Sequence, residues 1–195
     1  MPREKQFDET EAIRRFTEVF WQKGYKACSV GDLVAASGLS RSSLYDTFGD
    51  KEQLFVRCLQ YYGGHIRENL EAFTKDLPSP MEKIAGALQM PFHTYGQQAE
   101  NCKGCLVVNT MGELDGTNSE VQQLVMNART GYEAFLAACI EQGQAQGELI
   151  THAEPQALAR FLYAAMSGLL VIFKAAPNQA FLEEQVALIM KLLQK

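Results

Sequence analysis

The chain has 195 residues, 47% of them hydrophobic and 21% charged, which is typical of a globular protein with one large or two smaller hydrophobic cores. It carries five cysteines, an odd number, and its N-terminus has no apolar run of the kind found in secretory signals, so we expect a reducing, cytoplasmic setting and no disulfide framework. Its net charge is −5, whereas many nucleic-acid-binding proteins are basic, so the net charge by itself argues against a nucleic-acid partner.

Charge is distributed unevenly along the chain. Residues 1–60 carry nine Lys and Arg against nine Asp and Glu, so the rest of the chain holds the whole net negative charge. A neutral N-terminal part is compatible with DNA contact only where its basic residues gather on one face. Charge alone therefore decides nothing about a nucleic-acid partner.

Three short helices are predicted in the N-terminal part. The first has an apolar face that consists of Ile13, Phe16, Val19 and Phe20. Ser29 has the position of an N-cap for a second helix of about two turns, and Gly38 ends that helix. Ser40 caps a third helix that covers residues 41–47.

A longer helix follows, and its cap is Asp50. It is amphipathic up to about Phe73, and the loop over residues 77–80, which contains two prolines, interrupts the helical pattern. Beyond this loop the apolar spacing predicts five more helices, at about 81–97, 104–114, 118–146, 155–175 and 179–194. The predicted fold class is therefore all-α with about nine helices: a three-helix unit at 1–50 and a larger helical unit at 51–195, whose first helix connects the two.

One charge-free segment, residues 161–173, invites comparison with a membrane span. A bilayer needs about 20 apolar residues, and this segment has 13. We therefore expect a helix that is buried in a core or a subunit interface, and no membrane partner.

The second and third helices match the helix-turn-helix pattern. A turn of a few residues, here with Gly38, sets two helices at a steep angle, so that the second can enter the major groove of DNA. The residues predicted to face DNA at the start of the third helix are Ser40, Arg41, Ser42 and Ser43. Arg41 is the only one of them able to make two hydrogen bonds to a guanine, whereas the serines can serve base edges or phosphates.

The segment 29–54 resembles the DNA-binding signature of the TetR family of bacterial transcriptional regulators. The positions that carry the resemblance are Gly38, Leu39, Ser40, Leu44, Tyr45, Phe48, Lys51, Glu52 and Leu54. In that family the residues matching Tyr45 and Lys51 touch operator phosphates, and the residue matching Ser29 also approaches the DNA backbone. The resemblance thus adds Ser29, Tyr45 and Lys51 to the predicted DNA-binding residues.

The resemblance also extends, more loosely, to residues 104–114, which are similar to a segment of one branch of TetR-like C-terminal domains. It implies a homodimer that binds palindromic operator DNA, acts as a repressor rather than an enzyme, and is released by a small-molecule effector or another signal. We expect no cofactor. In the family the last two helices form the dimer interface. Apolar and small residues on those two helices independently predict such an interface: Phe161, Ala165, Gly168, Leu169, Ile172, Leu182, Val186 and Ile189.

A ligand cavity in the larger unit is predicted from its aromatic side chains and the few polar ones among them, although the same residues would also suit an ordinary core. The candidates are Phe92, His93, Tyr95, Cys105, Asn109, Met111, Tyr132, Phe135, Tyr163 and Met166.

Cys102 and Cys105 form a C-x-x-C pair with three possible roles: structural cysteines, a thiol switch that senses oxidants or electrophiles, or half of a zinc site. Lys103 would favour a thiolate, which is the argument for a thiol switch. Zinc needs about four ligands, and only His93 and Cys139 could complete the set, so we expect no metal.

Two other classes of protein remain as alternatives. A thiol oxidoreductase would use Cys102 and Cys105, but no βαβ pattern surrounds the pair as a thioredoxin-like site requires. A helical adaptor that binds only protein would leave the placement of Tyr45 and Lys51 unexplained.

Overall fold

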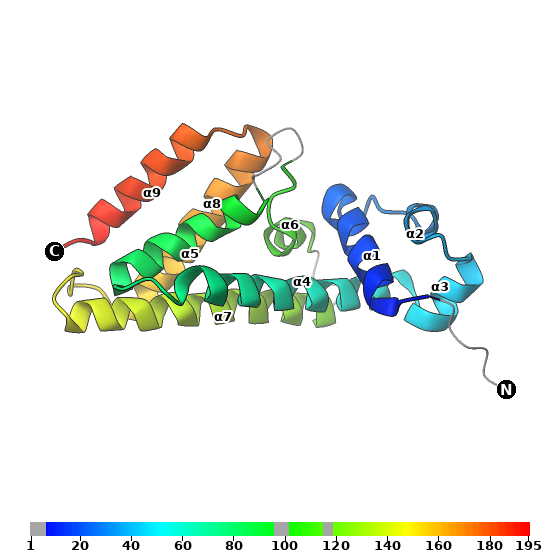
Figure 1. The fold of residues 1–195 in the computed structure, drawn as a ribbon, viewed down its shortest axis with the longest axis horizontal. Helices are drawn as coiled ribbons and strands as arrows, with labels where there is room; N and C mark the ends of the chain where they lie inside the picture. The colour runs from blue at the N-terminus through cyan, green and yellow to red at the C-terminus, as the bar shows by residue number, and fades with distance from the viewer. Residues whose placement is uncertain (1–6, 96–101, 115–118) are drawn as a thin grey trace.

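The structure is a computed structural model, and it describes residues 7–95, 102–114 and 119–195. Across these residues the chain forms nine α-helices, which confirms the predicted all-α fold class (Figure 1). Their bounds are α1 Glu9–Lys23, α2 Val30–Ser37, α3 Arg41–Phe48, α4 Lys51–Thr74, α5 Pro80–Tyr95, α6 Leu106–Glu113, α7 Ser119–Ala145, α8 Pro155–Ala175 and α9 Gln179–Leu193.

The short helices begin and end where local chemistry demands it. The hydroxyl oxygen of Ser29 accepts a hydrogen bond from the Asp32 N–H, and the Asp32 carboxylate accepts one from the Ser29 N–H, which completes a capping box on α2. Gly38 follows α2 in the left-handed conformation with φ of 71°, which other residues rarely adopt. The chain therefore turns sharply there and enters α3 with a fixed orientation.

Helices α1 to α3 and the start of α4 pack together through aromatic side chains at the N-terminal end of the chain's hydrophobic core. The rings of Phe16 and Phe48 meet edge to face with their centroids 5.3 Å apart, which joins α1 to α3. The rings of Phe20 and Phe55 lie 4.8 Å apart and join α1 to α4. Because α4 supplies part of this core, the helix-turn-helix cannot move as a unit without moving the start of α4.

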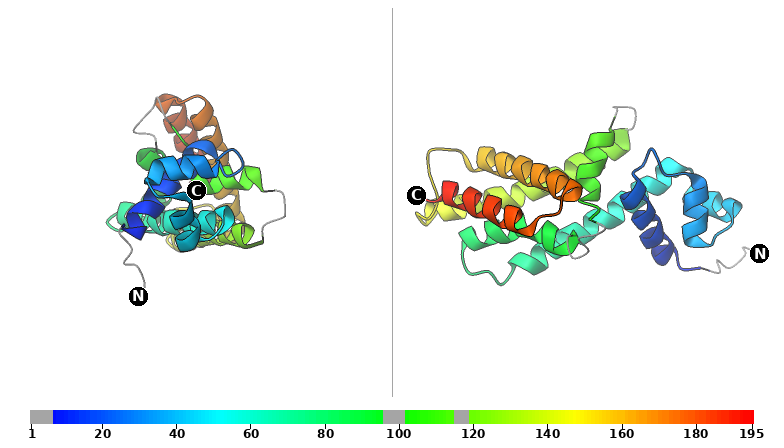
Figure 2. Two further views of the ribbon diagram at one scale, coloured as in Figure 1. Left: turned by 90° about the vertical axis from the view of Figure 1, so that its right-hand side faces the viewer. Right: turned by 90° about the horizontal axis from the view of Figure 1, so that it is seen from above.

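Helix α4 continues into the larger unit, where α7 runs beside it (Figures 1 and 2). Helix α5 packs against both α4 and α7, helix α8 packs against α7, and α9 packs mainly against α5. The N–H of Ile150, in the connection between α7 and α8, donates to the carbonyl oxygen of Leu193, 3.0 Å away. The C-terminal end of α9 is thereby joined to the end of the molecule farthest from α3 (Figure 1).

Helix α8 is longer than the charge-free segment in the sequence, because it extends at both ends beyond residues 161–173. Its 21 residues are long and apolar enough, by length and composition alone, to span a membrane. One face of it, however, packs within the chain: Leu162, Met166 and Leu170 are buried. The prediction of a helix that is partly core is consistent with this packing.

Candidate nucleic-acid interface and ligand site

The first turn of α3 is exposed and well ordered by its own side chains. The hydroxyl oxygen of Ser40 accepts a hydrogen bond from the Ser43 N–H at 3.1 Å and lies 3.0 Å from the hydroxyl oxygen of Ser42. Arg41 and Ser42 are exposed, and the Arg41 guanidinium carbon lies 5.9 Å from the centroid of the Tyr45 ring. The sequence-predicted residues of α3 are therefore brought together on one exposed turn.

Tyr45 and Lys51 extend this exposed surface onto the next turn and the next helix. Tyr45 is 39% exposed although it is a large aromatic residue. The ammonium nitrogen of Lys51 lies 4.5 Å from the centroid of the Tyr25 ring, a cation–π contact that positions the charge at the first residue of α4. Tyr25 could not be predicted from helical periodicity, because it lies in the turn after α1 and belongs to no helical face.

Ser29 lies at the N-cap of α2, so two predicted DNA-contacting serines, Ser29 and Ser40, mark helix N-termini. Backbone N–H groups at a helix N-terminus favour phosphate. The Ser29 hydroxyl also lies 2.8 Å from the Asp32 carboxylate, whose other oxygen is 2.5 Å from the Lys23 ammonium. These two interactions lower the pKa of Asp32 and leave its negative charge balanced by Lys23.

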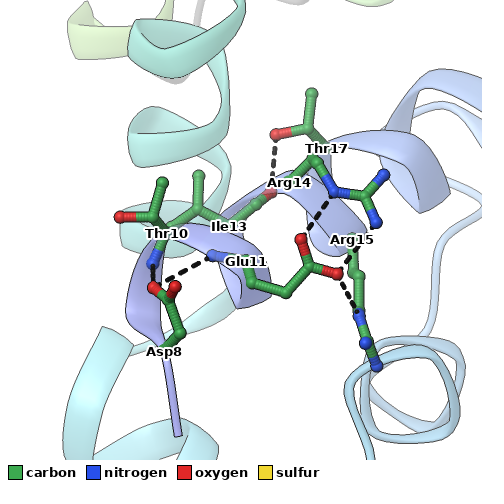
Figure 3. A network of polar contacts seen from close by, with 7 residues as sticks. All are labelled: Asp8, Thr10, Glu11, Ile13, Arg14, Arg15 and Thr17. Atoms are coloured by element: carbon green, nitrogen blue, oxygen red, sulfur yellow. Dashed lines mark hydrogen bonds and ion pairs between the residues drawn. The ribbon is translucent and has the colours of Figure 1, made fainter.

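Two of the basic residues in α1, Arg14 and Arg15, form ion pairs with the same acidic residue, Glu11. The carboxylate of Glu11 accepts hydrogen bonds from Arg14 at 2.7 Å and from Arg15 at 2.8 Å (Figure 3). These bonds lower the pKa of Glu11 to about 2, so it stays charged at neutral pH. A count of basic residues therefore overstates the positive charge that α1 offers to a phosphate.

The described residues of the larger unit line several cavities, three of which bear on the predicted ligand site. The first is an open groove of about 370 Å³ between α4 and α7, and the residues that line it include Leu59, Gly63, Gly64, Ile66, Arg67, Leu70, Val107, Ala128, Gly131 and Tyr132. An inner cavity of about 30 Å³ shares Ile66, Val107, Ala128 and Tyr132 with this groove. The third, of about 250 Å³, lies between α5 and α9.

The predicted ligand-site residues divide among these cavities. Cys105, Tyr132, Tyr163 and Met166 line the inner cavity, and Phe92 and His93 line the cavity between α5 and α9. Asn109, Met111 and Phe135 line none of these three cavities, and the side chain of Tyr95 lies outside the described residues. Tyr132 also lines the groove, so the predicted residues touch all three cavities, although the sequence pattern did not indicate the glycines that line the groove.

Helices α8 and α9 each expose apolar side chains to solvent, and we refer to these side chains together as the apolar face of α8 and α9. Its exposed residues are Phe161, Val171, Ile172, Leu188 and Leu192, with exposed fractions between 49% and 62%. Of the predicted interface residues, Phe161, Gly168 and Ile172 are exposed and Ala165 and Ile189 are half-buried.

The prediction needs correction at three positions of this face. Leu169, Leu182 and Val186 are already buried within the chain. They belong to its own core, because an apolar stripe on a helix does not reveal whether it faces the same chain or a partner.

Four of the five cysteines are buried, and Cys102 is half-buried. Burial raises the pKa of Cys105, which is 7% exposed and forms the N-cap of α6. Lys103, the residue expected to favour a thiolate, instead forms an ion pair with Glu18 of α1. A neutral, buried Cys105 is a poor nucleophile, so the structure does not favour the thiol switch.

This arrangement predicts a selective pattern of thiol labelling. With a small maleimide at pH 7.5, Cys102 should react within minutes, whereas Cys28, Cys58, Cys105 and Cys139 should react at least tenfold more slowly, because each is buried. Mass spectrometry of the labelled, folded protein measures the rates, and labelling in denaturant provides the fully reactive control. Rapid labelling of Cys105 in the folded state would instead restore the thiol-switch hypothesis.

Helix α6 connects the ligand-site region with the N-terminal unit. The indole N–H of Trp21 in α1 donates to the carbonyl oxygen of Gly104 at 2.9 Å, just before α6. At the other end of α6, the carboxylate of Glu113 accepts a hydrogen bond from the backbone N–H of Lys26 at 3.0 Å. We refer to these two hydrogen bonds as the α6 link. Since Val107 of α6 lines the groove, a shift of this helix would reach α1 and the turn before α2.

The tyrosine at the centre of α4 supports the same helix. The Leu106 N–H donates to the hydroxyl oxygen of Tyr62 at 3.2 Å, and the rings of Tyr62 and Trp21 meet edge to face with centroids 5.1 Å apart. From the sequence, Tyr62 is predicted only to lie within the amphipathic helix that begins after Asp50, and Trp21 carries no prediction. Neither contact has a local sequence signal, because the partners are far apart in the chain.

Most of the chain is similar to known bacterial transcriptional regulators. Residues 17–58 match the profile of "Bacterial regulatory proteins, tetR family", and residues 80–188 match "Tetracyclin repressor-like, C-terminal domain". The uncharacterized HTH-type transcriptional regulator YezE of Bacillus subtilis is 30% identical over 194 residues, which cover 95% of this chain and 96% of YezE. The HTH-type transcriptional repressor ComR of Escherichia coli is 29% identical over 171 residues, which cover 86% of this chain and 80% of ComR.

Among solved structures, a cysteine mutant of the TetR family transcriptional regulator CifR, complexed with a 26-base-pair double-strand operator DNA, has a TM-score of 0.86 to this chain. It is 26% identical in sequence, and the match covers 98% of this chain and 99% of that one.

Proposed function

The chain belongs to the TetR family of bacterial transcriptional regulators, and we propose that it is a repressor that binds palindromic operator DNA as a homodimer and dissociates when a small molecule binds its larger unit. The observation that carries this proposal is the exposed turn of α3. It places Arg41 and Tyr45 together at the end of the molecule farthest from the C-terminus, with Lys51 at the start of α4 (Figure 1). No core or capping requirement accounts for an aromatic residue left 39% exposed there.

The two ends of the molecule suit the two tasks of such a repressor. A palindrome is read by two recognition helices about one turn of DNA apart, roughly 34–36 Å, so two chains are needed. The apolar face of α8 and α9, at the opposite end from α3, supplies a surface through which two copies can pair. The DNA-binding turns are then left uncovered.

Release from DNA requires that the ligand favour a state that cannot bind the operator. A small molecule shifts the equilibrium only as far as it binds that state more tightly than the DNA-bound one. The α6 link offers a physical route, since it joins a wall of the groove to α1 and to the turn that precedes α2. We propose that ligand binding moves α6 and thereby changes the spacing of the two α3 helices.

We also propose that the protein works in the cytoplasm and catalyses no reaction. The relatives that it matches are named as transcriptional regulators, and a location beside DNA follows from that role. The oxidoreductase alternative needs a reactive thiolate, whereas burial raises the pKa of Cys105.

Selection of bound sequences from a pool of random DNA duplexes tests the proposal directly. Purified protein in reducing buffer should enrich one palindrome whose half-sites are about 10 base pairs apart from centre to centre. The selection is repeated after mild oxidation, and the same palindrome should persist, because the cysteines do not control binding. Failure to enrich any sequence in either condition would contradict the proposed function.

Three substitutions test the proposed DNA-binding residues. Tyr45→Ala and Lys51→Ala should each weaken operator binding about tenfold or more, equally across sequences, because each homodimer loses two phosphate contacts. Arg41→Ala should cost about 1–3 kcal/mol per half-site and also relax the preference for one base pair. Affinities are measured by fluorescence anisotropy on the selected operator and on operators with single base changes.

The matched control is Lys75→Ala, which removes an exposed positive charge from the far end of α4. It should leave operator affinity within twofold of the wild type. If the three substitutions at α3 and α4 behave like this control, the DNA interface lies elsewhere.

A further inference from the structure

The groove between α4 and α7 is kept open by three glycines that face empty space. Gly63 and Gly64 lie on α4 and Gly131 lies on α7, and a methyl group added at any of them would meet no atom within 4 Å. Glycine in the interior of a helix is less stable than alanine. All three glycines line the groove, so a larger side chain at any of them would occupy part of its volume.

The groove has the size and the polarity of a small-molecule site. Its volume of about 370 Å³ falls within the range of roughly 300–1,000 Å³ that ligand pockets occupy. Its walls are mainly aliphatic, with Leu59, Ile66 and Leu70 from α4 and Leu124 and Val125 from α7. A bound molecule must therefore be largely apolar.

The polar groups of the groove point to the charge of that molecule. Within the part of the chain that the structure describes, Arg67 is the only charged side chain in its lining, and no carboxylate lines it. Among the described residues Arg67 has no ion pair, although Glu68 follows it in the sequence. Asn127 accepts a hydrogen bond from Gln123 through its side-chain oxygen, so its amide NH₂ group is left to donate. Both groups offer donors to an anion.

We infer that this groove binds a small, mainly apolar organic anion, such as an aromatic or aliphatic acid, with the apolar part between α4 and α7 and the acidic group at Arg67. This inference rests on the proposed function, because it identifies the class of effector that the repressor senses. Val107 lines both the groove and the inner cavity and belongs to α6, so an occupant of the groove contacts the helix that carries the α6 link.

Two fluorescent probes of similar shape and different charge test the inference. 1-Anilinonaphthalene-8-sulfonate is an apolar anion, and N-phenyl-1-naphthylamine is its uncharged analogue. The wild type should bind one sulfonate probe per chain, about fivefold or more tighter than the neutral probe, because a positive charge beside apolar walls favours the anion. Arg67→Gln should remove this difference by weakening only the sulfonate probe, and Lys75→Gln, outside the groove, should preserve it.

A blocking variant tests the location independently of charge. Gly131→Leu fills the groove and should weaken both probes at least tenfold, whereas Gly112→Leu, which adds the same side chain at an open position of α6 outside the groove, should leave both affinities unchanged. Circular dichroism confirms that each variant is folded. Undiminished binding to Gly131→Leu, or equal weakening of both probes by Arg67→Gln, would overturn the inference.

The same protein preparations separate this inference from the proposed function. In one outcome, the DNA selection enriches a palindrome while the substitutions at Arg67 and Gly131 leave the probe affinities unchanged. In that case the proposed repressor function is supported and the groove is not its anion site. If the probe affinities change as expected and no DNA is selected, the anion site is supported and the repressor function is contradicted. When both hold, the sulfonate probe should lower operator affinity in the wild type and not in Gly131→Leu.

Discussion

Replacing Ile172 by glutamate should separate the homodimer and reduce operator affinity by at least 100-fold. Ile172 is exposed on the apolar face of α8 and α9. In a two-fold symmetric interface the substitution introduces two buried carboxylates, one from each chain, and neither would have a partner. A separated chain carries a single recognition helix and loses the second half-site. Sedimentation velocity at micromolar concentration, together with operator binding, measures both effects.

The matched control for this prediction is Gln142→Glu. It adds the same charge to an exposed position of α7, outside the apolar face of α8 and α9. This variant should remain a dimer and bind the operator as the wild type does. If Ile172→Glu also remains a dimer, the two copies associate through another surface.

The second large effect is expected from Phe16→Ala, which should unfold the DNA-binding end of the molecule. Phe16 is 0% exposed, and its ring meets that of Phe48 edge to face. Loss of a fully buried phenylalanine costs about 3–5 kcal/mol, whereas whole domains are stable by only about 5–15 kcal/mol. Operator binding should therefore be lost at 37 °C while the larger unit remains helical.

Trp21 makes this prediction convenient to measure. It is the only tryptophan in the chain and lies on α1, so its fluorescence reports on the unit that Phe16 stabilises. Urea denaturation followed by this fluorescence gives the change in the free energy of unfolding. Phe73→Ala is the control, because Phe73 is an exposed aromatic residue of α4 and its loss should cost less than about 1 kcal/mol. Similar losses in both variants would show that the Phe16–Phe48 contact does not stabilise this unit.

The helices of the DNA-binding end could be predicted closely because their limits are set by neighbouring residues. Ser29, Gly38 and Ser40 each act through a backbone group no more than four positions away, and the structure places all three at the helix ends where the sequence predicts them. The side chains that would contact DNA lie on short helices with such caps. Their arrangement could therefore be inferred without any knowledge of the tertiary packing.

The interface and the ligand site could be predicted only in part, for two different reasons. Val186 and Leu188 are both apolar residues of α9, yet one is buried in the chain and the other is half exposed. Periodicity identifies an apolar face and cannot decide which protein covers it. A cavity is harder still, because it is the volume that side chains leave empty, and Gly131 contributes to the groove by having none.

Both hydrogen bonds of the α6 link use a side chain on one partner and the main chain on the other: Trp21 donates to the carbonyl oxygen of Gly104, and Glu113 accepts from the N–H of Lys26. Main-chain groups do not depend on residue type, apart from the N–H that proline lacks. During evolution the residues that line the groove between α4 and α7 can therefore diversify, while Trp21 and Glu113 preserve the α6 link to the helix-turn-helix. A biosensor for a new compound could be sought by randomising the groove and leaving those two residues untouched.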